Sequence, residues 1–298
     1  MNSPLTRDDQ TLDSIRVSGG DRIFYTRTGT VGAPTILLLH GLSQQSHYWN
    51  PTVEYLSAHE LKLDVVAVDQ RGHGDSLDFT PNADFSIDRL AHDALEVLDA
   101  LGIDRAFVIG HSWGASVALR FGVLFPERTY ASVLIDGGAF NPTDMVPEIF
   151  PSIDELREAL RPPAGPFSET ELTSYYGSLS DHENLSGILK AVARTYREIA
   201  PGAFVTSIGM ERHMAVAEGL IAYSPNADLA AISIPLVVVR CEEGHNPRTW
   251  QLPEFRHNSN IRIIHWYGCT HDVPLQRPTM VASLIAQVVA LDQEDHID

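Results

Sequence analysis

The sequence predicts an α/β fold, namely a mainly parallel, doubly wound sheet with a helical segment inserted into it. Three observations carry this prediction. Short apolar, β-branched runs alternate with amphipathic stretches between residues 13 and 140. Prolines then cluster, and strand-like runs cease from about residue 141 until residue 234. The runs return at 234–240 and 261–267, so a single sheet is expected to enclose the insertion.

The predicted strands are apolar runs that suit burial on both faces of a sheet. The first two form a hairpin in SIRVSGGDRIFYT, with Gly19 and Gly20 at its turn. The buried strands are expected at residues 35–40, 63–69, 106–111, 131–136, 234–240 and 261–267.

The predicted helices follow from spacing and end signals. Between Ser86 and Leu101 apolar side chains recur every three or four residues, and Gly102 follows where a helix end favours positive φ. A last helix is expected near Thr279 to Leu291. Inside the insertion, the pairs Ser152 and Glu155, and Ser168 and Glu171, have capping-box spacing, which predicts helix starts.

The composition excludes several functional classes. The chain has 298 residues, 44% of them apolar, and a net charge of −18 from 39 acidic and 21 basic side chains. This charge opposes binding to nucleic acid and to anionic membranes. The N-terminus has no apolar leader-like run, and no stretch reaches the length of a membrane span. We expect a soluble, cytoplasmic monomer or homodimer whose partner is a small-molecule substrate.

The stretch GHSWG raises Ser112 as a candidate nucleophile. A G-x-S-x-G match arises by chance in roughly one chain in ten of this length, so its context must decide. Ser112 follows the buried strand at 106–111 and precedes a helical stretch. A sharp strand-to-helix turn there would expose the hydroxyl at the carboxyl end of the sheet, beside the free backbone donors of a helix N-terminus. The less specific interpretation is a buried packing serine.

A serine nucleophile needs a base within hydrogen-bond reach. Among 13 histidines, His271 has the best position, because it follows the last predicted strand at the same end of the sheet as Ser112. His40 and His111 occupy tight strand ends, where a structural role is expected.

At this point the chain resembles the α/β-hydrolase superfamily. The resemblance rests on His40-Gly41, on DQRGHGDS from Asp69 to Ser76, on GHSWG around Ser112, and on His271. It implies a core of residues 1–140 and 231–298, with residues 141–230 as a helical cap. It also implies an oxyanion hole made by the backbone N–H groups of Leu42 and Trp113. The family pattern gives the segment from Asp69 to Gly74 a structural role, with no metal and no organic cofactor.

The acid that would complete a triad departs from the common family pattern. Gly244, in CEEGHN, stands where many members have an Asp after the seventh strand. Asp136, after the sixth strand, is one substitute, and some branches such as pancreatic-type lipases and haloalkane dehalogenases use that position. Glu242 or Glu243 in the CEEGHN turn is the alternative, with Glu243 preferred of the two. We favour Asp136, which follows Ser112 by one helix and one strand.

Ser112 with an oxyanion hole suits acyl transfer, whereas an Asp nucleophile would have suggested a dehalogenase or an epoxide hydrolase. The expected reaction is hydrolysis of a small to medium, mostly apolar carboxylic ester or lactone through an acyl-enzyme. Three alternatives stay open: a carbon–carbon bond hydrolase, a cofactor-free perhydrolase, and a low-turnover ligand receptor. The candidate pocket residues are Trp113, Phe140, Tyr175, Tyr176, Met210 and Met214. Cys241 and Cys269 follow adjacent predicted strands, and free thiols are expected there.

Overall fold

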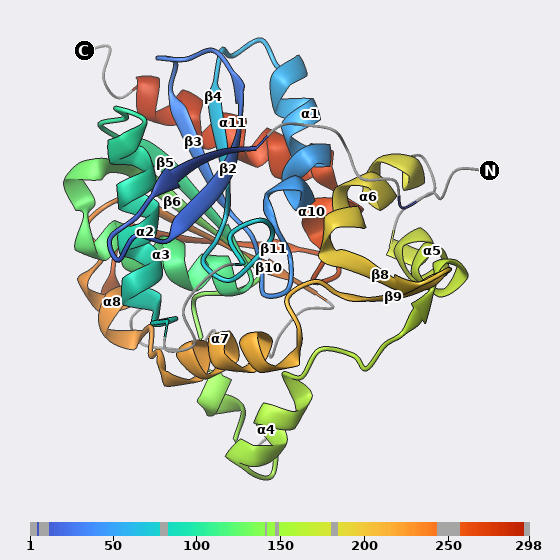
Figure 1. Ribbon diagram of the computed structural model, residues 1–298. Helices are drawn as coiled ribbons and strands as arrows, with labels where there is room; N and C mark the ends of the chain where they lie inside the picture. Colours follow the sequence, from blue (N-terminus) through green and yellow to red (C-terminus); the bar gives the residue numbers. More distant parts are fainter. Residues whose placement is uncertain are drawn as a thin grey trace.

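The computed structural model describes residue 5 and residues 12–77, 83–140, 142–146, 149–179, 184–242 and 257–294. Figure 1 shows a central sheet with helices on both faces and a further group of helices and short strands beyond one end of it. This is the predicted α/β-hydrolase fold with a mostly parallel central sheet.

The main sheet has eight strands in the described part of the chain, in the order β1-β2-β4-β3-β5-β6-β10-β11. β1 and β2 form the predicted antiparallel hairpin, β2 is also antiparallel to β4, and the remaining neighbours are parallel. The strands are β1 (Asp13–Arg16), β2 (Arg22–Gly29), β3 (Thr35–Leu39), β4 (Asp64–Asp69), β5 (Ala106–His111), β6 (Thr129–Ile135), β10 (Leu236–Cys241) and β11 (Ile261–Trp266).

Helices cover both faces of this sheet (Figure 1). The helices that flank it are α1 (Asn50–Ala58), α2 (Ile87–Ala100), α3 (Trp113–Leu124), α8 (Asn226–Ala231), α10 (Val273–Gln276) and α11 (Pro278–Glu294). The two helices predicted from spacing are α2 and α11. Ser86 begins α2 as predicted, because its hydroxyl accepts a hydrogen bond from the N–H of Arg89 at 3.2 Å.

Alternate residues of the central strands enter two separate cores. On β3, Leu37 and Leu39 pack with α2 and α3, whereas Ile36 and Leu38 pack with α1 and α11. This period of two explains why these strands read as continuous apolar runs, since both faces of the sheet are covered.

The segment between β6 and α8 lies beyond the carboxyl ends of the strands (Figure 1). Its helices are α4 (Ile153–Ala159), α5 (Glu169–Leu179), α6 (Leu185–Val192) and α7 (Met210–Ala222). Both predicted capping boxes begin helices here: Ser152 accepts from the N–H of Glu155 at 3.2 Å, and Ser168 accepts from the N–H of Glu171 at 3.1 Å.

The prediction of helices alone in this segment is wrong, because it also holds a small antiparallel sheet. Its strands are β7 (Phe167–Ser168), β8 (Tyr196–Ala200) and β9 (Ala203–Thr206), in the order β7-β9-β8. The strands are short, and most of β8 is exposed. They therefore lack the apolar runs from which the other strands were predicted.

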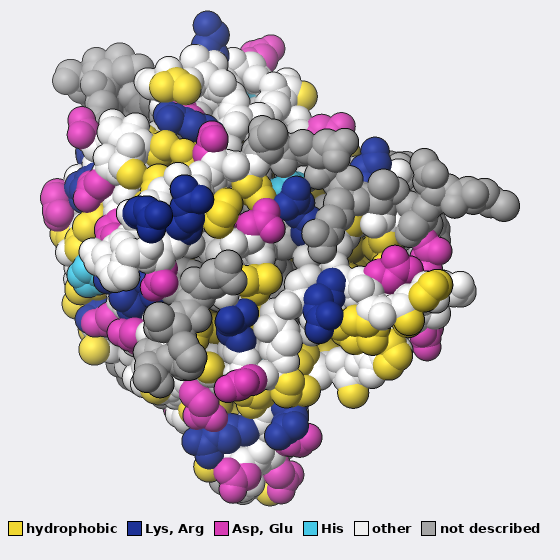
Figure 2. Space-filling view, in the orientation of Figure 1, with side chains coloured by type: hydrophobic (Ala, Val, Ile, Leu, Met, Phe, Trp, Pro, Cys, Tyr) yellow, Lys and Arg dark blue, Asp and Glu magenta, His cyan; other side chains and the backbone are white. Residues whose placement is uncertain are grey.

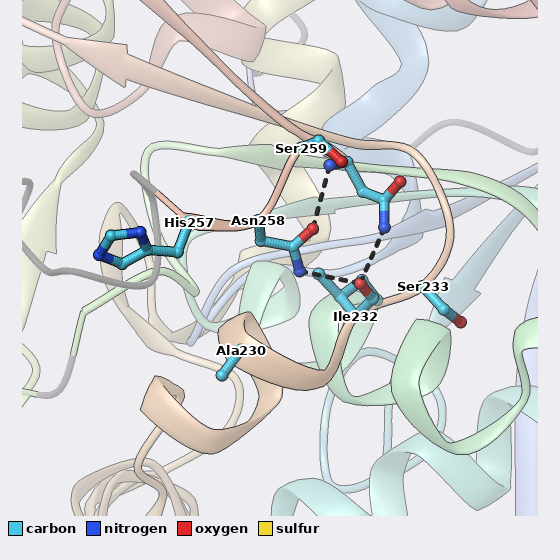
Figure 3. A pocket seen from close by; sticks show the side chains of 7 residues that line it. Ala230, Ile232, Ser233, His257, Asn258 and Ser259 are labelled. Atoms are coloured by element: carbon cyan, nitrogen blue, oxygen red, sulfur yellow. Dashed lines mark hydrogen bonds between the residues drawn. The ribbon is translucent and has the colours of Figure 1, made fainter.

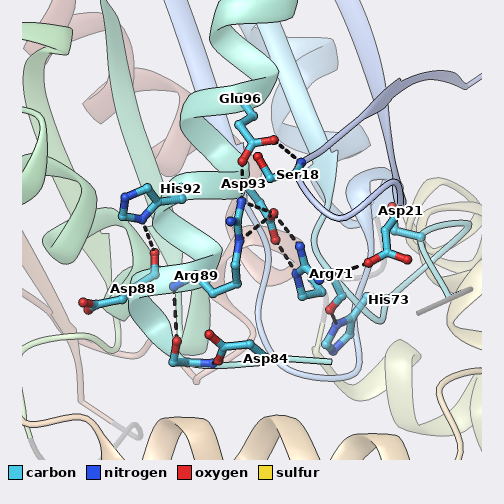
Figure 4. Close-up of polar contacts among 12 residues, drawn as sticks. Ser18, Asp21, Arg71, His73, Asp84, Asp88, Arg89, His92, Asp93 and Glu96 are labelled. Atoms are coloured by element: carbon cyan, nitrogen blue, oxygen red, sulfur yellow. Dashed lines mark hydrogen bonds and ion pairs between the residues drawn. The ribbon is translucent and has the colours of Figure 1, made fainter. Parts of the chain in front are cut away.

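The loop after β4, which carries DQRGHGDS, is held by a buried ion-pair cluster (Figure 4). Arg71 forms a bidentate pair with Asp93 of α2, at 2.6 and 2.7 Å, and both side chains are 5% exposed. Arg89 donates to the same carboxylate at 2.8 Å. Asp69 accepts from the N–H groups of Ser46 and Asp75 at 2.7 and 2.8 Å. These contacts agree with the structural role expected for this motif.

Charged side chains of both signs alternate over the face shown in Figure 2, most densely around α4. There Arg157 pairs with Glu218 at 2.7 Å, and Arg161 pairs with Glu158 at 2.7 Å. In the described ranges, no helix combines the length and the apolar character that crossing a membrane requires.

Candidate active site

Ser112 occupies a sharp turn between β5 and α3. Its φ and ψ are 54° and −119°, a conformation that a non-glycine residue rarely adopts. Its N–H donates to the carbonyl of Ile135 at 2.9 Å, which ties the turn to the end of the neighbouring strand. The predicted strand–turn–helix geometry is therefore present, and the hydroxyl lies at the carboxyl end of the sheet.

The two glycines of GHSWG are required by close backbone contacts. A Cβ on Gly110 would lie 2.2 Å from the carbonyl oxygen of Gly114. A Cβ on Gly114 would lie 2.4 Å from the carbonyl oxygen of Leu39. Any larger residue at either position would push α3 away from β3 and β5, so the motif's spacing is a packing requirement.

His271, in the loop between β11 and α10, joins Ser112 to Asp136. Its Nε2 lies 2.9 Å from the Oγ of Ser112, and its Nδ1 lies 2.6 Å from an Oδ of Asp136. Because an ionised carboxylate only accepts hydrogen bonds, Nδ1 carries the proton and Nε2 is left to accept from the serine hydroxyl. The ring is thus held in the tautomer that a general base for Ser112 requires.

Asp136 reaches this position because β6 lies between β5 and β10. Its N–H donates to the carbonyl of Val239, and its second Oδ accepts from the N–H of Cys241 at 3.1 Å. The side chain is 1% exposed, so this carboxylate is buried with a donor on each oxygen. Its φ of 44° turns the chain toward His271.

The alternative acids lie elsewhere or are not described. Glu242 is exposed and accepts from the N–H of Gly268 at 2.9 Å. Glu243 lies outside the described residues. The carboxylate beside His271 is that of Asp136.

His111 and His40 have structural roles next to the site, as their strand-end positions predict. His111 donates through Nε2 to the carbonyl of His271 at 2.8 Å, and its ring stacks on Tyr48 at 5.4 Å between centroids. His40 is fully buried; its Nδ1 lies 2.7 Å from the carbonyl of Gly41 and its Nε2 accepts from the N–H of Gln70. Burial lowers the pKa of His40 to about 3, so the ring stays neutral at physiological pH.

Leu42 and Trp113, the residues predicted to form an oxyanion hole, line the same cavity as Ser112. Within the described ranges, neither N–H donates to a protein acceptor. Trp113 is the first residue of α3, so its N–H is one of the unused donors of a helix N-terminus. Backbone donors without a protein acceptor are groups of the kind that stabilise an oxyanion in acyl transfer.

A cavity of about 590 Å³ opens over Ser112 and His271. Its floor comes from the strand ends and its roof from the segment between β6 and β10. The apolar side chains that line it are Leu42, Trp113, Phe140, Pro142, Met145, Phe150, Leu156, Ala159, Leu160, Pro162, Pro163 and Leu220. Tyr175 also lines it, so Trp113, Phe140 and Tyr175 lie where the sequence predicts.

Three other predicted pocket residues are corrected by the structure. Tyr176 is buried in a separate cluster and its hydroxyl bonds that of Tyr196 at 2.9 Å, because α5 turns this face toward α6 and β8. Met210 is 41% exposed at the start of α7. Neither these two nor Met214 lines the cavity that the described residues form.

Sequence reasoning missed Ser43, which lies just after Leu42. Among the described residues, Ser43, Ser112 and Asp136 are the non-glycine residues with positive φ, at 67°, 54° and 44°. All three line the cavity over Ser112. Unfavourable backbone conformations tend to gather at functional sites, and here they coincide with this one. Single residues at positive φ leave no sequence pattern when they are not glycine.

A second hollow, of about 530 Å³, lies at the opposite, amino-terminal side of β10 and β11 (Figure 3). The amide of Asn258 donates to the carbonyl of Ile232 at 2.9 Å, and that of Asn260 donates to the same carbonyl at 3.2 Å. The amides hold the loop in place. None of the residues that surround Ser112 lines this hollow.

Cys241 and Cys269 are both buried and form no disulfide. Burial raises the pKa of the Cys241 thiol well above its usual range, with Asp136 adding to the effect. This thiol therefore stays protonated and inert as a nucleophile at neutral pH.

The sequence matches the alpha/beta hydrolase family over residues 36–284. The chain belongs to this family.

The curated relatives of this alpha/beta hydrolase match only parts of it. Epoxide hydrolase B of Mycobacterium tuberculosis is 39% identical over 95 residues, which make up 32% of this chain and 26% of that protein. Epoxide hydrolase 4 of Mus musculus is 31% identical over 139 residues, 45% of this chain and 38% of that protein. The chain thus spans between about a quarter and two fifths of the length of these relatives.

Among solved structures, E-2-(acetamidomethylene)succinate hydrolase superposes with a TM-score of 0.73. The match covers 94% of this chain and 100% of that chain at 21% identity. At this identity the likeness is one of fold.

Proposed function

We propose that this alpha/beta hydrolase is a serine hydrolase that acts through an acyl-enzyme on small to medium, mostly apolar carboxylic esters or lactones. The observation that carries the proposal is the chain of contacts from Ser112 Oγ to His271 Nε2 at 2.9 Å and from His271 Nδ1 to Asp136 at 2.6 Å. The proposed chemistry uses protein groups alone.

In the first half-reaction, Ser112 Oγ attacks the carbonyl carbon while its proton passes to His271 Nε2. The carbonyl oxygen becomes an oxyanion, which the N–H groups of Leu42 and Trp113 stabilise. The bond to the leaving oxygen then breaks, and the Nε2 proton passes to that oxygen. Asp136 keeps its charge throughout and stabilises the imidazolium.

In the second half-reaction, His271 Nε2 takes a proton from water, and the resulting hydroxide attacks the acyl carbon. The tetrahedral intermediate collapses by breaking the bond to Ser112 Oγ, which recovers its proton from Nε2. The products are the carboxylic acid and the free enzyme.

The cavity supports the proposed substrate class. A volume of about 590 Å³ suits a small to medium ligand, and apolar side chains make up most of the lining. The epoxide hydrolase names belong to the relatives. Epoxide opening proceeds through an alkyl ester formed on an Asp nucleophile, so a serine at this position supports acyl transfer instead.

The direct test is labelling with a fluorophosphonate, which reacts with an activated serine. We expect modification at Ser112, located by peptide mass spectrometry, together with hydrolysis of p-nitrophenyl esters of short and medium chain length. Ser116 is a matched control because it lies on α3, lines the same cavity and is 2% exposed. Ser116→Ala should keep the label, and Ser112→Ala should lose it.

The other outcomes identify the competing functions. Labelling without ester turnover would favour a carbon–carbon bond hydrolase or a perhydrolase on the same residues. The absence of labelling in the folded protein would contradict the proposal and favour a ligand receptor with this fold.

A further inference from the structure

A buried histidine of α7 bonds to the loop that follows β3. His213 is 4% exposed; its Nδ1 lies 2.7 Å from the hydroxyl of Ser43 and its Nε2 lies 2.7 Å from the carbonyl of Leu160. A carbonyl only accepts, so Nε2 carries the proton and Nδ1 accepts from Ser43. Burial lowers the pKa of His213, which agrees with a neutral ring.

Ser43 is fixed through its backbone as well as its side chain. Its N–H donates to Nε2 of His73 at 3.2 Å, and Nδ1 of His73 in turn donates to the carbonyl of Arg71 at 3.1 Å. These bonds hold Ser43 at a φ of 67°, where a serine does not remain without support.

Leu42 lies between two residues that are held in this way. On its other side, the N–H of Gly41 donates to the side chain of Gln44 at 3.0 Å, and the N–H of Gln44 donates back to the carbonyl of Gly41 at 3.1 Å. The direction of the Leu42 N–H is therefore set by Gly41 and Ser43. Of these bonds, the one between Ser43 and His213 ties the loop to α7, in the segment between β6 and β10.

We propose that His213 is a positioning residue, which acts through Ser43 to aim the N–H of Leu42 at the developing oxyanion. This inference rests on the proposed serine hydrolase function. Donors in an oxyanion hole act on the tetrahedral species and not on the planar ester, and small displacements of such groups are costly. Loss of the Ser43–His213 bond should therefore lower kcat and leave KM nearly unchanged.

Two substitutions at residue 213 separate the bond from the packing of the ring. In His213→Asn, the amide oxygen takes the place of Nδ1 and still accepts from Ser43. In His213→Gln, the amide nitrogen takes the place of Nε2 and keeps only the bond to Leu160. Both variants lose the ring, so a difference between them reports the bond to Ser43.

We expect His213→Gln to lower kcat by about tenfold to a hundredfold, and His213→Asn to recover most of that loss. Ser43→Ala should match His213→Gln, and the double variant should lose no more than either single one, since both remove the same bond. Ser43→Gly serves if Ser43→Ala folds poorly, because glycine accepts the positive φ.

The second readout compares two inhibitors. A trifluoromethyl ketone forms a tetrahedral adduct with the serine and fills the oxyanion hole, whereas the matching amide stays planar. Affinity for the ketone should fall with kcat in His213→Gln and Ser43→Ala, and affinity for the amide should not.

The outcomes keep the two proposals apart. If the wild type hydrolyses esters but His213→Gln and Ser43→Ala keep its kcat and its ketone affinity, the role of His213 is overturned and the proposed serine hydrolase function stands. A rise in KM at constant kcat overturns it as well, because it would make the pair a substrate-binding contact. If the wild type neither turns over esters nor binds the ketone, both proposals fall.

Discussion

One wall of the pocket is formed by the ends of the sheet strands and the other by the segment between β6 and β10, and one glycine from each region differs in the space around its Cα. A Cβ on Gly137, beside Asp136, would lie 2.3 Å from the carbonyl oxygen of Ser112. In α5, the atoms nearest a Cβ on Gly177 are the side-chain carbons of Leu185, at 3.6 and 3.9 Å. Gly137 has no room for a methyl group, and Gly177 has.

The ion pairs of the two regions differ in how far their side chains are exposed to solvent. Arg71 and Asp93, behind the strand ends, are each 5% exposed, whereas Arg157 and Glu218, on α4 and α7, are 40% and 47% exposed. Exposed pairs contribute little to stability, while breaking a buried pair is costly. The loop after β4 is thus held by a buried ion pair, whereas the ion pair between α4 and α7 is exposed to solvent.

The largest expected effect is at the ends of the sheet strands, at Asp136, the proposed triad acid. Asp136→Asn keeps the shape and tolerates the φ of 44°. It should lower kcat by about 10³- to 10⁴-fold, because an amide does not hold His271 in the required tautomer. Ester hydrolysis measures the loss in kcat, and the denaturant midpoint checks that the substitution keeps the fold.

Glu243→Gln is the control for Asp136→Asn, because Glu243 is the alternative acid in the sequence. It should leave kcat near that of the wild type. Near-normal turnover in Asp136→Asn, with a large loss in Glu243→Gln, would reverse the assignment.

The next effect compares one methyl group in each region. Gly137→Ala should lower the free energy of unfolding by about 3 kcal/mol, since the new Cβ meets backbone atoms. Gly177→Ala should raise it by about 0.5 kcal/mol, because alanine favours a helix and finds space. Urea unfolding of both variants checks the contrast, and equal effects would refute the difference in packing.

A third effect is the pH dependence of stability from His40. Its folded pKa is about 3, below the usual value of 6.5. Between these values the unfolded chain binds the extra proton, so the free energy of unfolding falls as pH falls through 6.5. The contribution at pH 5 is about 2 kcal/mol.

His40→Gln removes this titration and keeps a donor and an acceptor near Gly41 and Gln70. From pH 7 to pH 5 its free energy of unfolding should fall by about 2 kcal/mol less than that of the wild type. If the free energy of unfolding depends on pH in the same way for the wild type and for His40→Gln, His40 is not the buried neutral group described.

The smallest effect is expected for the segment between β6 and β10. Leu156 of α4 is 2% exposed and lines the pocket, so Leu156→Ala enlarges it. The ratio of kcat/KM for hexanoate over acetate p-nitrophenyl esters should shift by about tenfold, as a few methylenes allow. Tyr176→Phe should leave this ratio unchanged, because Tyr176 does not line the pocket. A change in the ratio for this variant would show that Tyr176 contacts the substrate.

Local patterns in the sequence predict the main sheet, the helix starts and the sharp strand-to-helix turn at Ser112. Buried strands, capping boxes and G-x-S-x-G are short-range patterns, since each depends on residues a few positions apart. Ser112 and His271 could be predicted for the same reason, because each follows a recognisable strand. The short strands β8 and β9 carry no such pattern, since most of β8 is exposed and β9 has a single buried residue.

Only the tertiary structure decided which carboxylate faces His271 and which residues close the pocket. The sequence favours Asp136 and leaves Glu243 as the alternative, and the order of β5, β6 and β10 brings Asp136 to the ring. Ser43 and His213 are 170 positions apart, and nothing local joins them. Contacts of this kind depend on how whole elements pack, and that packing leaves no trace in the spacing of neighbouring residues.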